Sequence, residues 1–345
     1  MLLSHLRRVR VPHILRLAVL LGLAGLLAGC SQLVVLYPSG DVASQQGRLV
    51  VIATVLMLLI IVPVIFLTLF FAWRYRQNSR HADVDYSPDW HHSTRLELVI
   101  WAAPLMIIIA LGAVTWISTH QLDPYRPLDR ISATKPLTED NRPLEVEVVS
   151  LDWKWLFFYP ELGIATVNEL AAPVDRPIRF RLTSSHTMNA FYIPALAGMI
   201  YTMPGMQTEL NAVINKPGTY KGMSSHYSGA GFSGMHFQFL GLSPEDFDGW
   251  VARAKAEGRP LTRDAYRELA RPSERNPVVR YASVEDGLYQ RVLNLCVEEG
   301  QACMHEVMAR DALRNRAHAS AQRLASATEE TMCLAPDART APVKF

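Results

Sequence analysis

The residues of this sequence with the strongest redox and metal-binding chemistry are its four cysteines, which lie towards opposite ends of the chain. Cys30 follows an apolar run, whereas Cys296, Cys303 and Cys333 lie near the C-terminus. In an oxidising compartment two of these three could form a disulfide, which leaves one unpaired. A Cys296–Cys303 bridge requires a bend or a loop, because two turns of helix would hold the thiols too far apart. A metal site that joins Cys303 to His305 is disfavoured, since positions two apart on a helix point to different faces.

Residues 1–29 are typical of an export signal. Several arginines precede a charge-free apolar run at 17–29, and this run is too short for the ~20 residues that a bilayer core of ~30 Å requires. The run ends in Leu27-Ala28-Gly29-Cys30, which resembles the lipobox of bacterial lipoproteins. This resemblance implies cleavage before Cys30, acylation of that residue, and a lipidated periplasmic N-terminus over 30–48.

Two longer runs, 49–73 and 98–119, contain no Asp, Glu, Lys or Arg. At ~1.5 Å per residue each is long enough for a transmembrane helix. The connecting loop, 74–97, carries four arginines, whereas 31–47 has neither Lys nor Arg. Basic residues favour the cytoplasmic side, so the loop is predicted to be cytoplasmic and both flanking parts periplasmic. The sequence therefore predicts a two-pass protein of a bacterial inner membrane.

The remaining chain predicts a soluble domain in two parts. From 120 to 243, strand-like alternation as in Glu145–Val149, Ile178–Leu182 and Thr208–Val213 is separated by Pro and Gly turns, which favours an all-β sandwich or barrel. From 244 to 345 the pattern becomes helical. The formal net charge of +2 gives no electrostatic reason to expect nucleic acid.

Three stretches carry a family resemblance: 150–157 (SLDWKWLF), 188–210 (MNAFYIPALAGMIYTMPGMQTEL) and 217–236 (PGTYKGMSSHYSGAGFSGMH). With the lipobox and the helix pair, they resemble subunit II of the haem–copper terminal oxidases, in the branch of the cytochrome bo-type ubiquinol oxidases. The resemblance implies a two-helix transmembrane hairpin plus an all-β cupredoxin-like sandwich, followed by the helical C-terminal extension.

In the cytochrome c oxidase branch of that family, the sandwich binds a dinuclear copper centre, CuA, through two histidines, two cysteines, a methionine and a glutamate carbonyl. The matching positions here, in chain order, are Asn189, Ser224, His226, Ser228, Phe232 and Met235. Only the methionine is kept. Two copper ions need bridging thiolates, and a serine hydroxyl is a hard donor that stays protonated near neutral pH. No metal is therefore expected in this chain.

A rebuilt copper site is the alternative at the same place. It would use His186, His226, His236 and Met235, since His226 and His236 are ten residues apart with glycines between them. No cysteine lies nearby in the sequence, and isolated histidines are commoner than new metal sites, so this alternative is disfavoured.

The resemblance assigns the chain to a proton-pumping complex that oxidises ubiquinol and reduces oxygen to water. It implies no cytochrome c partner and no cofactor in this chain. Haems and a copper ion are expected in partner subunit I, beside subunits III and IV and membrane lipid. The chain itself would have a structural and assembly role.

The same resemblance suggests roles for three side chains. Glu97 matches the carboxylate at the cytoplasmic mouth of the proton channel called K, although it also suits the first turn of a helix. Trp153 matches the aromatic residue at which electrons enter copper in the cytochrome c branch. Without copper, Trp153 and Trp155 are expected to pack the sandwich onto subunit I.

Two other functions remain as alternatives. One is a membrane-anchored cupredoxin-like lipoprotein for oxidase assembly or copper handling, which the missing ligands and the helix pair disfavour. The other is a cytochrome c oxidase subunit with degenerate copper ligation, which Ser224 and Ser228 disfavour.

Overall fold

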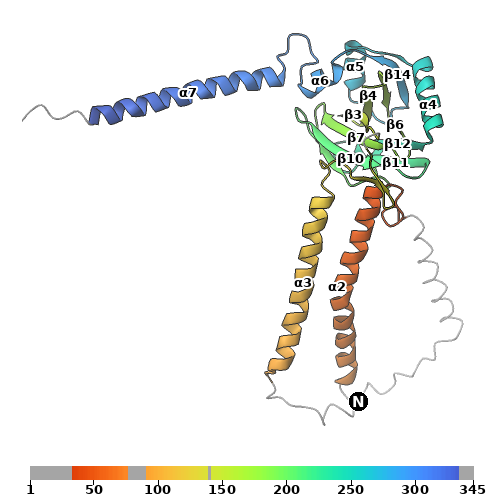
Figure 1. Cartoon of the computed structure of the whole chain (residues 1–345), viewed down its shortest axis with the longest axis vertical. Coiled ribbons are helices and arrows are strands. Elements are labelled where there is room, and N and C mark those ends of the chain that lie inside the picture. The colour runs from red at the N-terminus through yellow and green to blue at the C-terminus, as the bar shows by residue number, and fades with distance from the viewer. Residues whose placement is uncertain (1–32, 77–90, 139–140, 334–345) are drawn as a thin grey trace, which may run out of the picture.

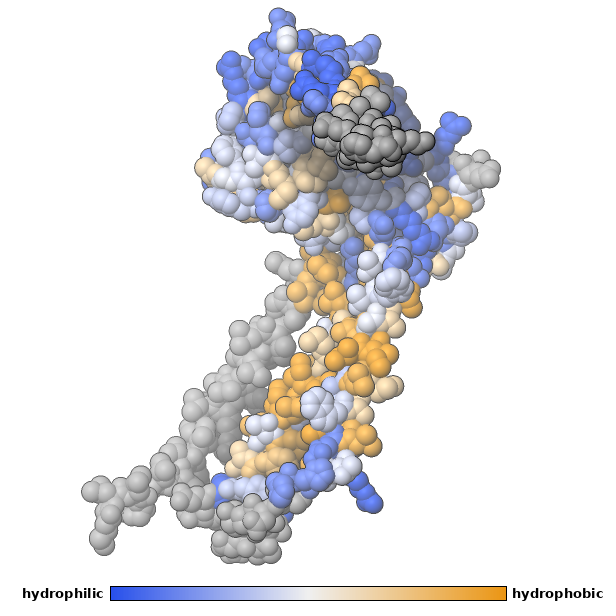
Figure 2. All heavy atoms as spheres, turned by 90° about the vertical axis from the view of Figure 1, so that its left-hand side faces the viewer, coloured by the Kyte–Doolittle hydropathy of each residue, from blue (hydrophilic) through white to orange (hydrophobic). Residues whose placement is uncertain are grey.

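The computed structural model describes residues 33–76, 91–138 and 141–333. Two long helices stand side by side below a β-sandwich, and a third projects away from its top (Figure 1). The paired helices are α2 (Asp41–Arg74) and α3 (Thr94–Gln121). Both are long and apolar enough to cross a membrane, and neither apolar stretch is buried within the chain. Figure 2 shows them as a hydrophobic stem below a more polar head.

The first turn of α2 is buried in the sandwich domain rather than lying below it. Gly40 precedes the helix, and a Cβ there would lie 2.6 Å from the Val213 carbonyl oxygen, so only glycine fits. The buried Asp41 carboxylate accepts a 2.8 Å bond from Arg130 Nε. The transmembrane helix is thus joined to the domain by packing and by an ion pair.

The domain consists of two packed sheets. The larger has the strand order β10-β7-β3-β4-β5-β14-β13 and the smaller β6-β12-β11-β8-β9. The strands of the larger sheet are β3 (Leu144–Leu151), β4 (Lys154–Tyr159), β5 (Ile164–Val167), β7 (Pro177–Ser184), β10 (Thr208–Val213), β13 (Arg259–Leu261) and β14 (Val279–Val284). Those of the smaller are β6 (Glu169–Pro173), β8 (Asn189–Tyr192), β9 (Ile200–Thr202), β11 (Gly218–Ser224) and β12 (His236–Leu242). A separate short pair, β1 (Arg130–Ser132) and β2 (Lys135–Pro136), follows α3.

An aromatic cluster fills the space between the two sheets. Trp155 is fully buried, and its ring lies 5.4 Å from that of Phe191 and 5.7 Å from that of Phe237. Phe191 and Phe237 stack at 5.4 Å, and Phe157 packs beside both. Aromatic rings bury large apolar areas and gain from offset and edge-to-face contacts, so this cluster fixes the two sheets against each other.

The C-terminal part contributes strands as well as the expected helices. β13 and β14 extend the larger sheet at its edge. The helices are α4 (Pro244–Glu257), α5 (Arg263–Ala270), α6 (Leu288–Leu293) and α7 (Met304–Cys333). A second apolar cluster, which includes Tyr266 and Tyr289, packs on the outer face of the larger sheet. Arg280, on β14, forms an ion pair with the buried Glu169 carboxylate of the smaller sheet, with Nη2 2.9 Å from Oε1. This pair stabilises the added edge of the larger sheet.

A disulfide joins Cys296 to Cys303. The two residues lie outside helices, between α6 and α7, as a bridge at this spacing requires. His305 Nδ1 instead contacts Asn294 Oδ1 at 3.0 Å.

Candidate functional sites

The six positions that match copper ligands lie at one end of the smaller sheet and on the loop that follows it. Asn189 begins β8, and Ser224 ends β11 on the adjacent strand. Both are buried, and the Ser224 Oγ lies 3.1 Å from Asn189 Oδ1 and 3.2 Å from the His226 carbonyl oxygen, so these two acceptors share its one O–H proton. Asn189 Nδ2 donates to the Thr187 carbonyl at 3.0 Å. These polar groups therefore satisfy one another without a metal ion.

The loop from Tyr227 to Met235 closes this end of the sandwich. Ser228 Oγ lies 4.0 Å from the Met235 sulfur, and Met235 is fully buried. Phe232 starts the short helix η2 (Phe232–Gly234), and its ring lies 5.6 Å from that of Tyr227. The thioether and the phenyl ring thus serve as packing groups.

This set of side chains does not fit a dinuclear copper centre. An amide, two hydroxyls and a phenyl ring stand where soft donors are needed, and a single thioether cannot hold two copper ions. Across the described ranges, no group of three or more His, Cys, Asp or Glu is placed to hold a metal ion. His186, His226 and His236 are therefore not gathered into one site, which leaves the rebuilt copper site without structural support.

Trp153 lies in the turn between β3 and β4, directly beneath the copper-position loop. Its backbone is left-handed, with φ of 64°, and its Nε1–H donates to the Ser228 carbonyl at 3.0 Å. The loop crosses the indole ring at Gly231, where a Cβ would lie 2.4 Å from a ring carbon. Trp153 is partly exposed. Trp155 is fully buried in the core, so it has no ring surface to offer a partner.

Glu97 lies in the first turn of α3, at the end of the helix far from the sandwich (Figure 1). Its Oε1 atom lies 2.7 Å from His92 Nδ1 and accepts a 3.3 Å bond from the Ser93 backbone N–H. Thr94 Oγ1 lies 3.2 Å from His92 Nε2. The Glu97 side chain remains 45% exposed, so its second oxygen can reach solvent or a neighbouring subunit.

Two titratable groups outside these sites were not found from the sequence. Lys154 is 1% exposed, and its Nζ donates to the Arg271 carbonyl at 2.7 Å and to Ser273 Oγ at 2.5 Å. Burial lowers the pKa of this lysine, opposed by the charge of Asp152. Burial also raises the pKa of Glu147 to about 7. The positive charge of Arg181 opposes this shift, and the negative charge of Glu145 adds to it. Tertiary burial, which a strand pattern does not report, causes both shifts. Cys30 lies outside the described residues.

Comparison with known proteins gives one family. The family model "Cytochrome C oxidase subunit II, periplasmic domain" matches residues 147–239, and the "COX Aromatic Rich Motif" matches 255–300. Cytochrome bo(3) ubiquinol oxidase subunit 2 of Pseudomonas putida is 43% identical over 323 residues, covering 93% of this chain and 99% of that relative. Ubiquinol oxidase subunit 2 of Acetobacter aceti is 48% identical over 78% of this chain and 84% of its own length.

Among solved structures, the periplasmic domain of subunit II of the Bradyrhizobium japonicum cytochrome oxidase is 25% identical, with a TM-score of 0.32. It covers 33% of this chain and 94% of that chain.

The sandwich, the helix pair and the matched models define a subunit II of the haem–copper oxidase class, with a cupredoxin-like domain. Within that class, the chain belongs to the family of the cytochrome bo(3) ubiquinol oxidase subunit 2 proteins. Two helices able to span a membrane and a periplasmic family domain fit a protein of the bacterial inner membrane.

Proposed function

We propose that this chain is a subunit without cofactors in a proton-pumping complex that oxidises ubiquinol and reduces oxygen to water. The observation that carries the proposal is the replacement of the copper donors by a hydrogen-bonded Asn189–Ser224 pair in a chain of this family. Electrons from cytochrome c would have no copper to enter. The donor is then membrane quinol, oxidised in subunit I, which holds the haems and a copper ion.

The chain's contribution is structural, with the sandwich docked on subunit I and with subunits III and IV in the same complex. We propose Leu49–Trp73 and Leu98–Thr119 as the membrane-crossing parts of α2 and α3, with 74–97 cytoplasmic. The sandwich (120–243) and its extension (244–345) are then periplasmic. Trp153, which is partly exposed beneath the copper-position loop, is the aromatic residue offered to the partner.

We further propose Glu97 as the carboxylate at the cytoplasmic entrance of a proton pathway. A carboxylate can collect protons when it is accessible and is not locked in a strong ion pair. Glu97 meets the first condition, and His92 and Ser93 both bind the same oxygen, Oε1. Neither contact occupies Oε2. His92 and Ser93 are positioning residues for this carboxylate.

Co-purification tests the assignment. A tagged full-length chain should bring down a haem-bearing, many-helix subunit, and the complex should take up oxygen with ubiquinol but not with reduced cytochrome c. Metal analysis of the separated chain should find no stoichiometric copper. Two coppers per chain with a purple absorption would refute the quinol assignment, and a chain purified alone with bound copper would favour copper handling or assembly.

The lipid anchor is proposed from the lipobox alone. Intact mass of the mature chain should show cleavage before Cys30 with added acyl mass, and Cys30→Ala should abolish the added mass. An unchanged mass in the variant would refute the anchor.

A further inference from the structure

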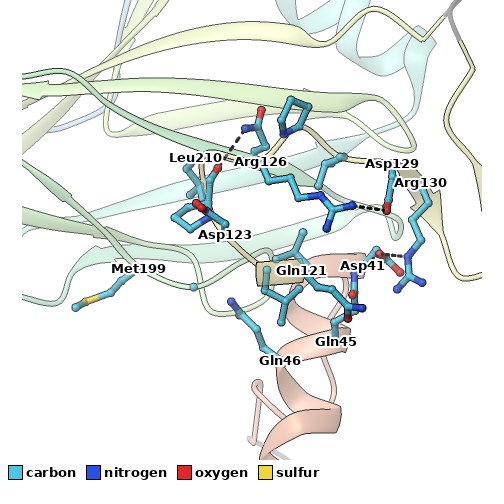
Figure 3. A pocket seen from close by; sticks show the side chains of 17 residues that line it. Asp41, Gln45, Gln46, Gln121, Asp123, Arg126, Asp129, Arg130, Met199 and Leu210 are labelled. Atoms are coloured by element: carbon cyan, nitrogen blue, oxygen red, sulfur yellow. Dashed lines mark hydrogen bonds and ion pairs between the residues drawn. The ribbon is translucent and has the colours of Figure 1, made fainter. Parts of the chain in front are cut away.

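A cavity of about 240 Å³ lies where the two membrane helices meet the sandwich. It opens between the start of α2, the segment that follows α3, and the loop that carries Met199 (Figure 3). Its volume is large beside the ~30 Å³ that one water occupies in the liquid, so it admits a chemical group of several heavy atoms.

The depth of the cavity relative to the bilayer follows from the helix geometry. Gln45 and Gln46 line it three to four residues before Leu49, and Gln121 lines it two residues after Thr119. At ~1.5 Å per residue these side chains begin about 3–6 Å above the apolar runs. The headgroup layer on each side of a bilayer is about 5–8 Å thick. With the membrane topology proposed above, the cavity therefore lies at the level of the lipid headgroups on the periplasmic side.

The lining carries charges of both signs. Two guanidinium groups, of Arg126 and Arg130, face three carboxylates, of Asp41, Asp123 and Asp129. Arg130 uses Nε for Asp41 and Arg126 uses Nη2 for Asp129 at 3.4 Å. Each guanidinium has five N–H donors. Contacts within the described residues use few of them, so the others can donate to phosphate oxygens.

The carboxylates exceed the guanidinium groups by one, which disfavours a purely anionic ligand. Asp123 is exposed, and its Oδ1 atom accepts a 2.9 Å bond from the Tyr125 backbone N–H, the one hydrogen bond to this carboxylate from the described part of the chain. Its other oxygen can accept a hydrogen bond from a primary ammonium, which has three N–H donors, as lysine does. A quaternary ammonium has no N–H donor and cannot form this hydrogen bond.

We propose that this cavity binds the headgroup of a phosphoethanolamine lipid, with its phosphate at Arg126 and Arg130 and its ammonium at Asp123. The acyl chains then run along apolar side chains that the structure leaves exposed just below, such as Val50 and Ile117. Trp116 is 70% exposed in the last turns of α3, where a tryptophan belongs at a membrane interface. Charge, donor count and depth all agree on this ligand.

The experiment measures lipid retention by the purified oxidase complex in nanodiscs, read by native mass spectrometry. Discs contain phosphatidylethanolamine mixed with either phosphatidylcholine or phosphatidylglycerol. Wild type should retain phosphatidylethanolamine in preference to both. Arg126→Gln should weaken retention of phosphatidylethanolamine and phosphatidylglycerol alike by about tenfold, because one charge-assisted contact is lost. Asp123→Asn should remove the preference for phosphatidylethanolamine over phosphatidylcholine.

Exposed charges far from the cavity serve as matched controls: Arg310→Gln on α7 and Asp248→Asn on α4 should retain lipid as wild type does. Inorganic phosphate in excess should not displace the lipid, and displacement by phosphate alone would assign a soluble anion instead. Equal retention by wild type and both cavity variants would overturn the proposal, as would a crosslink showing that a side chain of another subunit fills the cavity.

Discussion

The imidazole Nδ1 of His92 lies 2.7 Å from Oε1 of Glu97 at the end of α3 that is far from the sandwich. Both side chains are solvent-accessible, at 62% and 45% exposure. If Nδ1 carries the proton, the neutral ring donates to the carboxylate and Nε2 accepts from Thr94 Oγ1, 3.2 Å away. The three residues then form a hydrogen-bonded chain that ends on the carboxylate.

Glu97→Gln should slow quinol-driven oxygen uptake roughly tenfold. This is less than the 10²-fold or more of a lost general acid, because water can still deliver protons more slowly. Steady-state oxygen uptake by the purified complex gives the measurement. Unchanged turnover and pumping would remove Glu97 from the proton pathway.

His92→Ala should slow uptake about two- to threefold when Glu97 is present and have no further effect in Glu97→Gln, as expected for two coupled residues. His120→Ala, at the other end of α3, is the matched control and should leave uptake unaltered. Additive effects of His92→Ala and Glu97→Gln would show that His92 acts independently of the carboxylate.

Gly231→Ala should displace the copper-position loop from Trp153. The added Cβ would lie 2.4 Å from the indole ring. A Cβ at Gly163, which lies in another turn, would meet no atom within 4 Å, so the clash is specific to Gly231. The expected result is a red shift of tryptophan emission as Trp153 becomes more exposed, together with weaker association with the haem-bearing subunit. Gly234→Ala, with a milder 3.2 Å contact to the Arg275 side chain, is the control. Wild-type emission in Gly231→Ala would refute the close packing.

Glu147→Gln should make the domain more stable above pH 7 and leave it unchanged below about pH 4.5. The folded-state pKa, about 7, exceeds the ordinary value of 4.5 because of burial. Between these values the unfolded chain ionises while the folded protein keeps the proton, so stability falls as pH rises. Allowing for solvent screening of a partly exposed group, the gain should be about 1 kcal/mol. Thermal melts at pH 4 and pH 8 give the measurement, and equal gains at both would refute the shift.

Replacing Cys296 and Cys303 by alanine should loosen the start of α7. A bridge that closes a loop with a sequence separation of 7 is worth about 2 kcal/mol by loop-closure entropy. Hydrogen exchange should accelerate in α6 and in the first turns of α7, with α2 and the smaller sheet unaffected. Exchange unchanged in α6 would show that the bridge adds no local stability.

Sequence patterns predicted the strands whose alternation is long and regular. Glu145–Val149 and Ile178–Leu182 lie in β3 and β7, and Phe247, Trp250 and Ala254 form the buried face of α4. The alternation depends on local period alone, which a single sequence displays. β13 and β14 were not expected, because they lie in the region whose sequence pattern is helical, and they owe their conformation to the sheet edge that they join.

For the site residues too, local sequence patterns were informative and tertiary contacts were not predictable. Trp153 and Trp155 are two apart, which in a continuous strand would place them on one face. The pairing of Leu151 with Lys154 makes Asp152 and Trp153 a turn instead, so the two rings part. Sequence could not reveal that Asp41 is buried against Arg130, since that contact joins residues 89 positions apart.

That contact has a mechanical consequence. α2 is a helix of 34 residues, about 50 Å long at 1.5 Å per residue, and its first turn belongs to the sandwich. Along α2, the described residues between the sandwich and the apolar run are continuous helix, with no linker between them. A tilt of the sandwich domain is therefore expected to be transmitted into α2 and through it into the membrane.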